Sequence, residues 1–297
     1  MQVKNARYLL LIAATPFFLF SCVPQRRVSA HQQEIAKLDS ALQEYSKKLK
    51  AQDLQRLEKQ SQNEMDDTTS ARMQKFIGIA NEEINKALTQ NQILIGQTAV
   101  NRDDWEQLKK GLSLARSTSK IINDKVSLIT DLMNRTAVIR LDQDLIFAPG
   151  KYEAGPDVAG AIAKIFEPAA REIDFFIQKY PDFPLSLVIT AKGYADGTTI
   201  SEGSALYKDL VNRLRLNAKE PDEKELNKQL SRLRAEEVIN LLKKYTEGKS
   251  VAGGNVGNIL YIFEGKGDAF PDPKISDYKL DDPRRRVVLL FWGLFPE

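Results

Sequence analysis

The sequence predicts an α+β fold in which a long helical region precedes a mixed domain. Residues 30–135 contain no proline and have apolar residues at alternating spacings of three and four, which is typical of amphipathic helices. From residue 136 onward, short β-branched and aromatic runs alternate with longer amphipathic segments. The order strand, helix, strand, helix, strand, strand predicts one sheet with helices on one face.

The N-terminus is typical of a cleavable secretory signal. Lys4 and Arg7 precede an apolar run at residues 8–20, and the small residue Ser21 follows. Cys22 is the only cysteine of the chain and comes directly after that small residue. A cysteine in this position is the acceptor in lipoprotein maturation, so we expect a lipid on Cys22.

We expect residues 1–21 to be the signal and residues 22–34 to be a lipidated linker. The apolar run contains Pro16 and is shorter than the roughly 20 residues of a spanning helix. Lipidation would anchor the chain in the cell outer membrane, facing the periplasm, and Val23 is compatible with sorting to that membrane. The alternative is a secreted protein without lipid, in which Cys22 is a free thiol.

Residues 35–135 are predicted to form three helices with breaks near residues 66–70 and 101–104. Both breaks contain the Asp, Asn, Ser and Thr residues that cap helix N-termini. The spacing places one apolar stripe on each helix, which favours pairing with another helix. Two interpretations follow. The region is either a coiled-coil stalk that self-associates or binds a protein partner, or a bundle that packs on itself.

In the mixed domain, the strands are predicted from β-branched and aromatic runs and the helices from apolar residues at helical spacing. The predicted strands are residues 138–147, 185–190, 259–263 and 286–292. The predicted long helices are residues 157–179 and 223–245. Pro168 lies inside the first of these helices and predicts a kink or a break there.

Four short motifs occupy the ends of these elements. They are Gly193-Tyr194-Ala195-Asp196, then Asn227, Leu230, Ser231, Arg234 and Ala235, then Gly265-Lys266-Gly267-Asp268 with Pro271, then Arg284-Arg285-Arg286-Val287. In order and context, residues 136–297 resemble the OmpA C-terminal, peptidoglycan-binding domain family. The helix motif is the most specific part, because all five of its identities match at their spacing. The chain departs from the family pattern at Tyr194, Ala195 and Arg284.

The resemblance implies non-covalent binding of the diaminopimelate side of the peptidoglycan stem peptide. It implies that Asp196 and Arg234 contact the ligand and that Asn227 lines the same pocket. The chemistry is consistent, because the distal carbon of diaminopimelate bears an ammonium and a carboxylate. A fixed carboxylate can pair with the first, and the fork of a guanidinium suits the second. The alternative is that Asp196 and Arg234 form a salt bridge only with each other.

Two features depart from a simple family domain. Residues 197–226 form an insertion, with a predicted short helix at residues 205–216, that would act as a lid, add wall contacts or obstruct the pocket. Arg284, Arg285 and Arg286 suggest either a phosphate or nucleic-acid site, or a structural entry to the last strand with at least one arginine paired with an acid.

Composition argues against several other function classes. The formal net charge is +3, so there is no strong basic field for nucleic acid. The single histidine, His31, and the single cysteine leave little for a metal site or a nucleophile with a histidine base. We therefore expect no enzyme activity, catalytic residue, cofactor or metal. We expect a lipid-anchored protein that ties the outer membrane to the wall. The alternative is a wall-docking component of a larger secretion or motility assembly.

Overall fold

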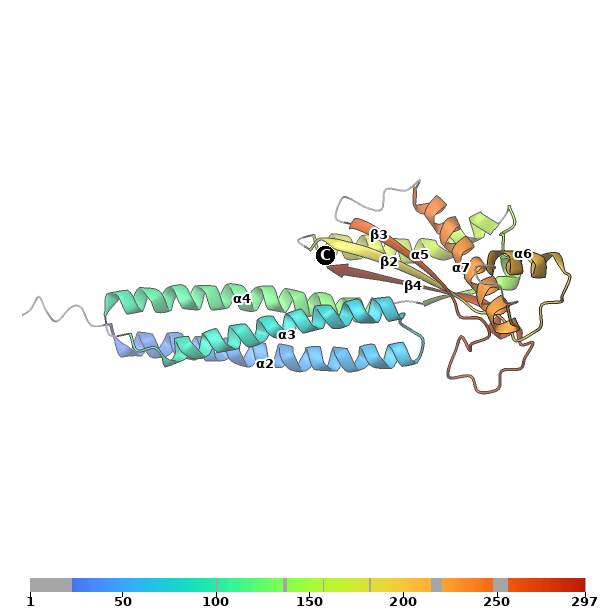
Figure 1. Cartoon of the computed structure of the whole chain (residues 1–297). Coiled ribbons are helices and arrows are strands. Elements are labelled where there is room, and N and C mark those ends of the chain that lie inside the picture. Colours follow the sequence, from blue (N-terminus) through green and yellow to red (C-terminus); the bar gives the residue numbers. More distant parts are fainter. Residues whose placement is uncertain are drawn as a thin grey trace, which may run out of the picture. The chain divides into compact units, whose positions relative to one another are not determined.

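The computed structural model describes residues 23–99, 101–135, 138–156, 158–181, 183–214, 221–247 and 256–296 (Figure 1). The predicted signal and Cys22 lie outside these residues. The chain divides into two compact units. Unit 1 comprises Met1–Ala51 and Ile77–Ser127, and unit 2 comprises Gln52–Phe76 and Leu128–Glu297. Within the described ranges, no helix is both long and apolar enough to cross a membrane.

The three predicted helices of residues 35–135 are present as α2 (Gln25–Ser61), α3 (Asp67–Gly96) and α4 (Arg102–Arg135). Helix α2 begins before residue 35, so most of the predicted linker is helical. The Pro24 carbonyl accepts from the Arg27 N–H at 2.8 Å, which is consistent with proline as a favoured residue at a helix start.

Helix α4 begins with the predicted cap. The Asn101 side chain accepts from the Asp104 N–H at 2.9 Å, and the Asp104 carboxylate accepts from the Asn101 N–H at 3.3 Å. This reciprocal pair satisfies two backbone donors that the helix itself cannot.

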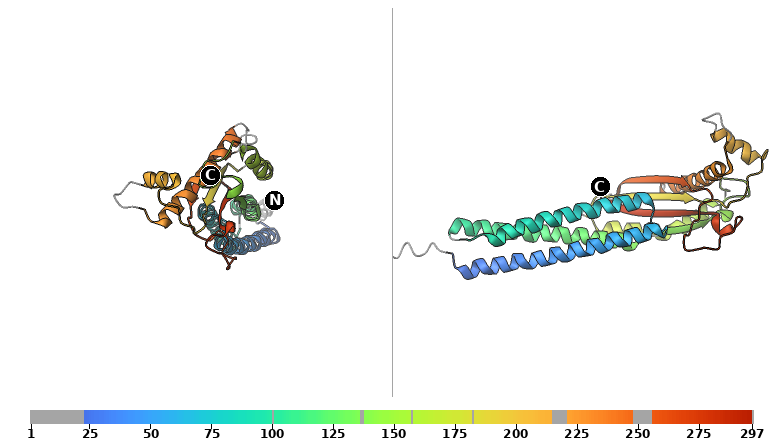
Figure 2. Two further views of the ribbon diagram at one scale, coloured as in Figure 1. Left: turned by 90° about the vertical axis from the view of Figure 1, so that its right-hand side faces the viewer. Right: turned by 60° about the horizontal axis from the view of Figure 1, so that its bottom comes forward.

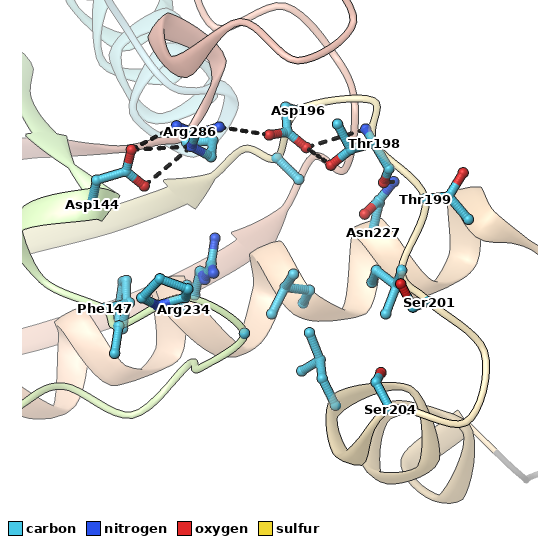
Figure 3. A pocket seen from close by; sticks show the side chains of 17 residues that line it. Asp144, Phe147, Asp196, Thr198, Thr199, Ser201, Ser204, Asn227, Arg234 and Arg286 are labelled. Carbon is cyan, nitrogen blue, oxygen red and sulfur yellow. Dashed lines mark hydrogen bonds and ion pairs between the residues drawn. The ribbon is translucent and has the colours of Figure 1, made fainter.

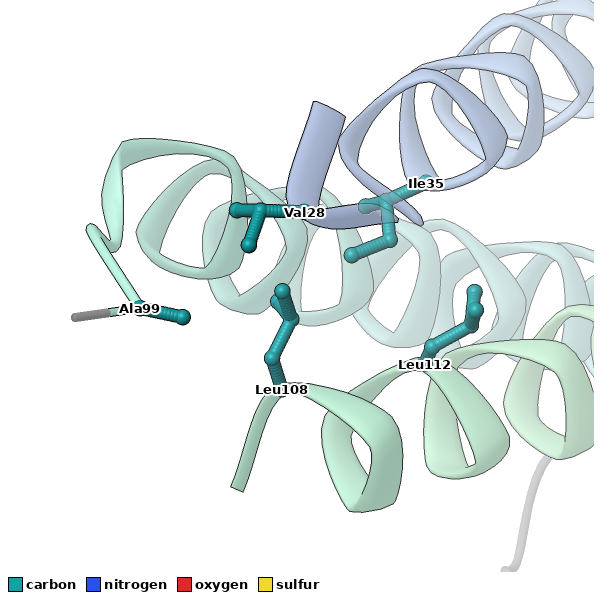
Figure 4. Close-up of a cluster of buried hydrophobic side chains, with 5 residues drawn as sticks. All are labelled: Val28, Ile35, Ala99, Leu108 and Leu112. Carbon is teal, nitrogen blue, oxygen red and sulfur yellow. The ribbon is translucent and has the colours of Figure 1, made fainter. Parts of the chain in front are cut away.

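In unit 1 the helices pack on one another. A buried apolar cluster joins α2, α4 and the segment after α3 and consists of Val28, Ile35, Ala99, Leu108 and Leu112; Leu94 and Ile95 of α3 pack against it (Figure 4). Polar contacts also link the helices: Asn91 donates to Asp39 at 2.7 Å, and Lys125 pairs with Glu83 at 2.5 Å. The self-packed bundle is therefore the interpretation that the contacts support, and self-association of the region stays a prediction.

Unit 2 contains a four-stranded mixed sheet in the order β1-β4-β2-β3 (Figure 2). The strands are β1 (Val138–Asp142), β2 (Leu185–Gly193), β3 (Val256–Gly265) and β4 (Val287–Pro296). β4 is antiparallel to both β1 and β2, and β2 is parallel to β3. The helices of the mixed domain are α5 (Val158–Lys179), α6 (Ala205–Leu214) and α7 (Glu223–Glu247). The predicted α+β class is confirmed, and α5 is assigned as one helix through Pro168.

All four strands differ in length from the prediction: β2 and β3 are longer, at Leu185–Gly193 and Val256–Gly265, and the two strands next to 3-10 turns have different ends. β1 ends at Asp142, because its side chain caps a 3-10 turn at Gln143–Leu145 by accepting from the Asp144 N–H. The last strand begins at Val287, after a second 3-10 turn at Pro283–Arg285, and extends to Pro296. Both turns place polar side chains at the end of the sheet where β2 ends.

Helix α7 packs closely on one face of the sheet, and two motif glycines make this possible. A Cβ at Gly193 would lie 2.0 Å from the Ser231 carbonyl oxygen, and one at Gly265 would lie 2.1 Å from the Lys228 carbonyl oxygen. Real Cβ atoms do not approach backbone this closely, so these positions accept only glycine without a shift of the helix.

The prediction that helices cover only one face of the sheet is wrong. The segment that joins α2 to α3 contacts the other face, where the Thr190 hydroxyl donates to Asp66 at 3.2 Å. Lys192 pairs with Asp67 at 3.6 Å on the same face. Every residue of β2 is buried as a result. Thr190 and Lys192 are polar residues within a largely apolar strand. They were the sequence feature that indicated polar partners on this face of the sheet.

Candidate binding site

A pocket of about 570 Å³ lies at the end of the sheet where β2 ends (Figure 3). Segments far apart in sequence form it: the turn after β1, the loop after β2, one side of α7 and the residue before β4. Asp196, Asn227 and Arg234, the three residues predicted to bind ligand, all line this pocket. The resemblance therefore selected residues that the structure brings together.

Arg234 is buried in α7, with 8% of its surface exposed. Its Nε donates to the Lys151 carbonyl at 3.1 Å and its Nη1 donates to the Gln143 side chain at 2.6 Å. The guanidinium also lies over the Phe147 ring, 5.4 Å from the ring centre. Among the described residues, no carboxylate forms an ion pair with it, so neutral acceptors alone hold this cation.

Burial lowers the pKa of Arg234 to about 10, although the nearby charges of Asp144 and Asp196 raise it again. The nearby Arg286 adds to the lowering. A pKa of about 10 keeps the guanidinium protonated at neutral pH. The pocket therefore presents a buried positive charge whose solvation by water has largely been lost.

Gln143 fixes the orientation of Arg234, and the sequence analysis did not identify it. Its Nε2 donates to the carbonyls of Tyr194 at 2.7 Å and Val287 at 2.9 Å, so its carboxamide oxygen must face the guanidinium. The sequence feature that could have pointed to Gln143 is its place as a polar residue inside the predicted first strand. In the structure Gln143 is almost fully buried.

Asp196 lies across the pocket from Arg234 and pairs with a different arginine. One oxygen accepts from the Thr198 N–H at 3.2 Å and from the Thr198 hydroxyl. The other oxygen accepts from Arg286 Nη1 at 2.9 Å. Partial burial raises the pKa of Asp196, but the hydrogen bonds from Thr198 and Arg286 outweigh this effect, and the pKa lies below its usual value. Asp196 is therefore ionised at neutral pH.

Arg286 bridges two carboxylates, because it also pairs with Asp144 at 2.7 Å (Figure 3). The hydrogen bonds that Arg286 donates to both acids raise its pKa. The alternative in which Asp196 and Arg234 form a salt bridge with each other is wrong. The pocket instead contains two acids and two arginines, with three of the four linked and Arg234 left apart.

Asn227 is 6% exposed and occupies the first part of α7. Its Nδ2 donates to the Thr198 carbonyl at 3.5 Å, which is a long hydrogen bond. This contact links the helix to the loop that follows Asp196. Asn227 therefore holds the rim of the pocket and also lines it.

The insertion forms part of the pocket wall. Helix α6 packs against α7 through a cluster of Leu210, Val211, Leu226, Leu230 and Leu233. Tyr152 fastens α6 to the segment before α5, since its hydroxyl donates to Asp209 at 2.7 Å. Helix α6 ends at Leu214, and the rest of the predicted helix lies outside the described residues. Of the three roles expected for the insertion, the described part shows the second, added wall contacts around an open pocket.

Each arginine of the triplet before β4 has partners of its own. Arg284 pairs with Asp282 at 2.6 Å, and Arg286 joins the pocket acids. Arg285 is 5% exposed and donates to the carbonyls of Lys279 at 3.1 Å and Leu280 at 3.2 Å, and also to the carbonyl of Asp268. These contacts show a structural role for the triplet.

Across the part of the chain that is described, no group of three His, Cys, Asp or Glu side chains is placed to hold a metal ion. His31 lies in α2 and packs against Trp105, with the ring centres 4.6 Å apart. Comparison with known proteins finds no family model that matches the chain and no significant match among curated proteins.

Proposed function

We propose that this chain is a lipid-anchored envelope protein whose C-terminal domain is of the OmpA-like, peptidoglycan-binding type. In this proposal the pocket binds the stem peptide of peptidoglycan without covalent chemistry. A lipid on Cys22 holds the chain in the outer membrane, and the protein thereby ties that membrane to the wall. The proposal assigns the pocket to binding and not to catalysis.

The observation that supports this proposal most directly is Arg234. A buried guanidinium held by a carboxamide and a carbonyl, without a carboxylate, is an incomplete site. A buried charge is costly unless it is paired and hydrogen-bonded. A carboxylate supplied by a ligand would complete it, in the bidentate geometry that arginine favours.

The second half of the site suits an ammonium group. Asp196 is ionised and has one oxygen on Arg286, which is itself shared with Asp144. If a ligand ammonium takes the place of Arg286 on Asp196, Arg286 keeps Asp144 as its partner, so no buried charge is left unpaired. Asp196 and Arg234 then form the complement of a zwitterion, as the distal carbon of diaminopimelate requires.

A second candidate function has an observation of its own. Unit 1 has an apolar hollow of about 240 Å³ between α3 and α4. Ile93 is 60% exposed and Leu114 is 61% exposed, and both line this hollow. A wall-docking component of a larger envelope assembly would use such a surface for a protein partner.

Co-sedimentation with purified peptidoglycan sacculi tests the main proposal. The full chain in detergent is compared with Arg234→Gln and with the matched control Arg232→Gln, which changes an exposed arginine on the same helix. We expect the unaltered chain and the control to sediment with sacculi and Arg234→Gln to stay in solution. Equal sedimentation of both variants, each folded by circular dichroism, would contradict the assignment of the pocket.

A further inference from the structure

The pocket has two ends of different chemistry. One end contains all four charged side chains, Asp144, Asp196, Arg234 and Arg286. The other end is uncharged and comes mostly from the insertion. Figure 3 shows Thr199, Ser201 and Ser204 of the insertion on the side of α6, away from Asp144 and Phe147. A ligand that fills the pocket must therefore have a charged end and an uncharged part.

The size of the pocket supports this division. A volume of about 570 Å³ lies within the range of about 300–1,000 Å³ that accommodates drug-sized ligands. The ammonium and carboxylate of one amino-acid end group need only the part of it near Arg234 and Asp196. The remaining volume lies beside the insertion.

The uncharged wall has both apolar and hydrogen-bonding groups. Ile200 and Leu206 pack with the cluster between α6 and α7, so the loop that bears the hydroxyls is fixed in place. The Ser204 hydroxyl accepts from the Tyr207 N–H at 3.0 Å and is occupied as a cap of α6. Thr199 and Ser201 are exposed residues of the pocket lining, and their hydroxyls form no hydrogen bond with any residue that the structure describes.

We propose that the insertion forms a second subsite, which recognises the amide groups and aliphatic side chains of the peptide attached to the zwitterionic end group. Hydroxyls of Thr199 and Ser201 would bond amide groups of that peptide, while Ile200, Leu206 and Leu230 contact its aliphatic part. The pocket then selects a stem peptide over the free diamino acid. This inference rests on the proposed function, because it assumes that the charged end binds diaminopimelate.

Calorimetric titration of the full chain in detergent tests the subsite. The probes are free meso-diaminopimelate and the stem tetrapeptide that contains it. Two net hydrogen bonds predict that the tetrapeptide binds at least about tenfold more tightly than the free amino acid. The double variant Thr199→Val, Ser201→Ala should lose this preference and bind the free amino acid as the unaltered chain does. The matched control is Ser276→Ala, an exposed serine outside the pocket.

The outcomes separate the two proposals. Equal affinity of the unaltered chain for both probes, or an undiminished preference in the double variant, overturns the subsite while the proposed function stands. If neither probe binds, the proposed function is wrong and the subsite falls with it. An unchanged thermal midpoint of the double variant shows that any loss of preference comes from the hydroxyls and not from unfolding.

Discussion

Two arginine-bearing regions of unit 2 differ in how their charges are satisfied. Before β4, Arg284 and Arg285 bind an acid or backbone carbonyls close by in sequence, and Arg286 binds the pocket acids Asp144 and Asp196. On α7, the buried Arg234 has a carboxamide and a carbonyl but no carboxylate among the described residues. We therefore interpret Arg284 and Arg285 as structural, and the isolated charge of Arg234 as the mark of the proposed binding site. For locating a binding site, the lack of a carboxylate partner at Arg234 is more informative than the number of arginines in a segment.

The largest expected effect comes from the structural region. Arg285→Met removes a nearly buried guanidinium that donates to three backbone carbonyls, and we expect a loss of about 2–4 kcal/mol in the free energy of unfolding. Urea denaturation measures this change. The control Lys279→Met alters an exposed side chain of the same loop and should leave the midpoint nearly unchanged. A stability of Arg285→Met equal to that of the control would show that the two regions do not differ as described.

Asp196→Asn should weaken ligand binding while the fold persists. The variant keeps the size of the side chain but loses the negative charge that faces a ligand ammonium. We expect a loss of about 2 kcal/mol, or about thirtyfold in affinity for the diaminopimelate tetrapeptide. Isothermal titration gives the affinity. An unchanged dissociation constant would mean that Asp196 only positions Arg286.

Asp144→Asn tests how Arg286 is shared between Asp144 and Asp196. Without Asp144, Arg286 has only Asp196 as an acidic partner, so a ligand ammonium must compete for that single carboxylate. We expect a weaker loss, about 1 kcal/mol or fivefold in affinity. A gain in affinity would contradict the exchange of partners proposed for Arg286.

The smallest expected effect is a loss of folding stability at low pH that depends on Asp196. The pKa of Asp196 in the folded chain lies below its ordinary value of 3.8. The unfolded chain therefore binds more protons as the pH falls below about 4, and the stability that Asp196 contributes above this pH is lost. Thermal midpoints between pH 6 and pH 2.5 should converge for the unaltered chain and Asp196→Asn. A constant difference between the two curves would contradict this linkage.

Local patterns predicted much of this molecule. Helical spacing gave α2, α3 and α4, and the motif on α7 located Arg234 and Asn227 in one pocket with Asp196. These features depend on residues close together in sequence, or on a motif whose identities match at every position. The helix start at Gln25 was missed, although Val28 lies seven residues before Ile35 and belongs to the same buried cluster.

Long-range polar pairs were not predictable in the same way. The contact of Thr190 with Asp66 and the bridge from Arg286 to Asp144 join residues more than 100 positions apart. Neither pair leaves a periodic signal, because each is one hydrogen bond set by how the sheet and turns pack. Gln143 illustrates the same point. Its role depends on three partners that only the folded chain assembles.

A structure of the protein with the diaminopimelate tetrapeptide bound would test the central claim most directly. The account predicts that the distal carboxylate of the ligand lies within hydrogen-bond distance of Arg234 and that the distal ammonium contacts Asp196. A ligand carboxylate on Arg286, with Arg234 still bonded only to Gln143 and Lys151, would contradict it.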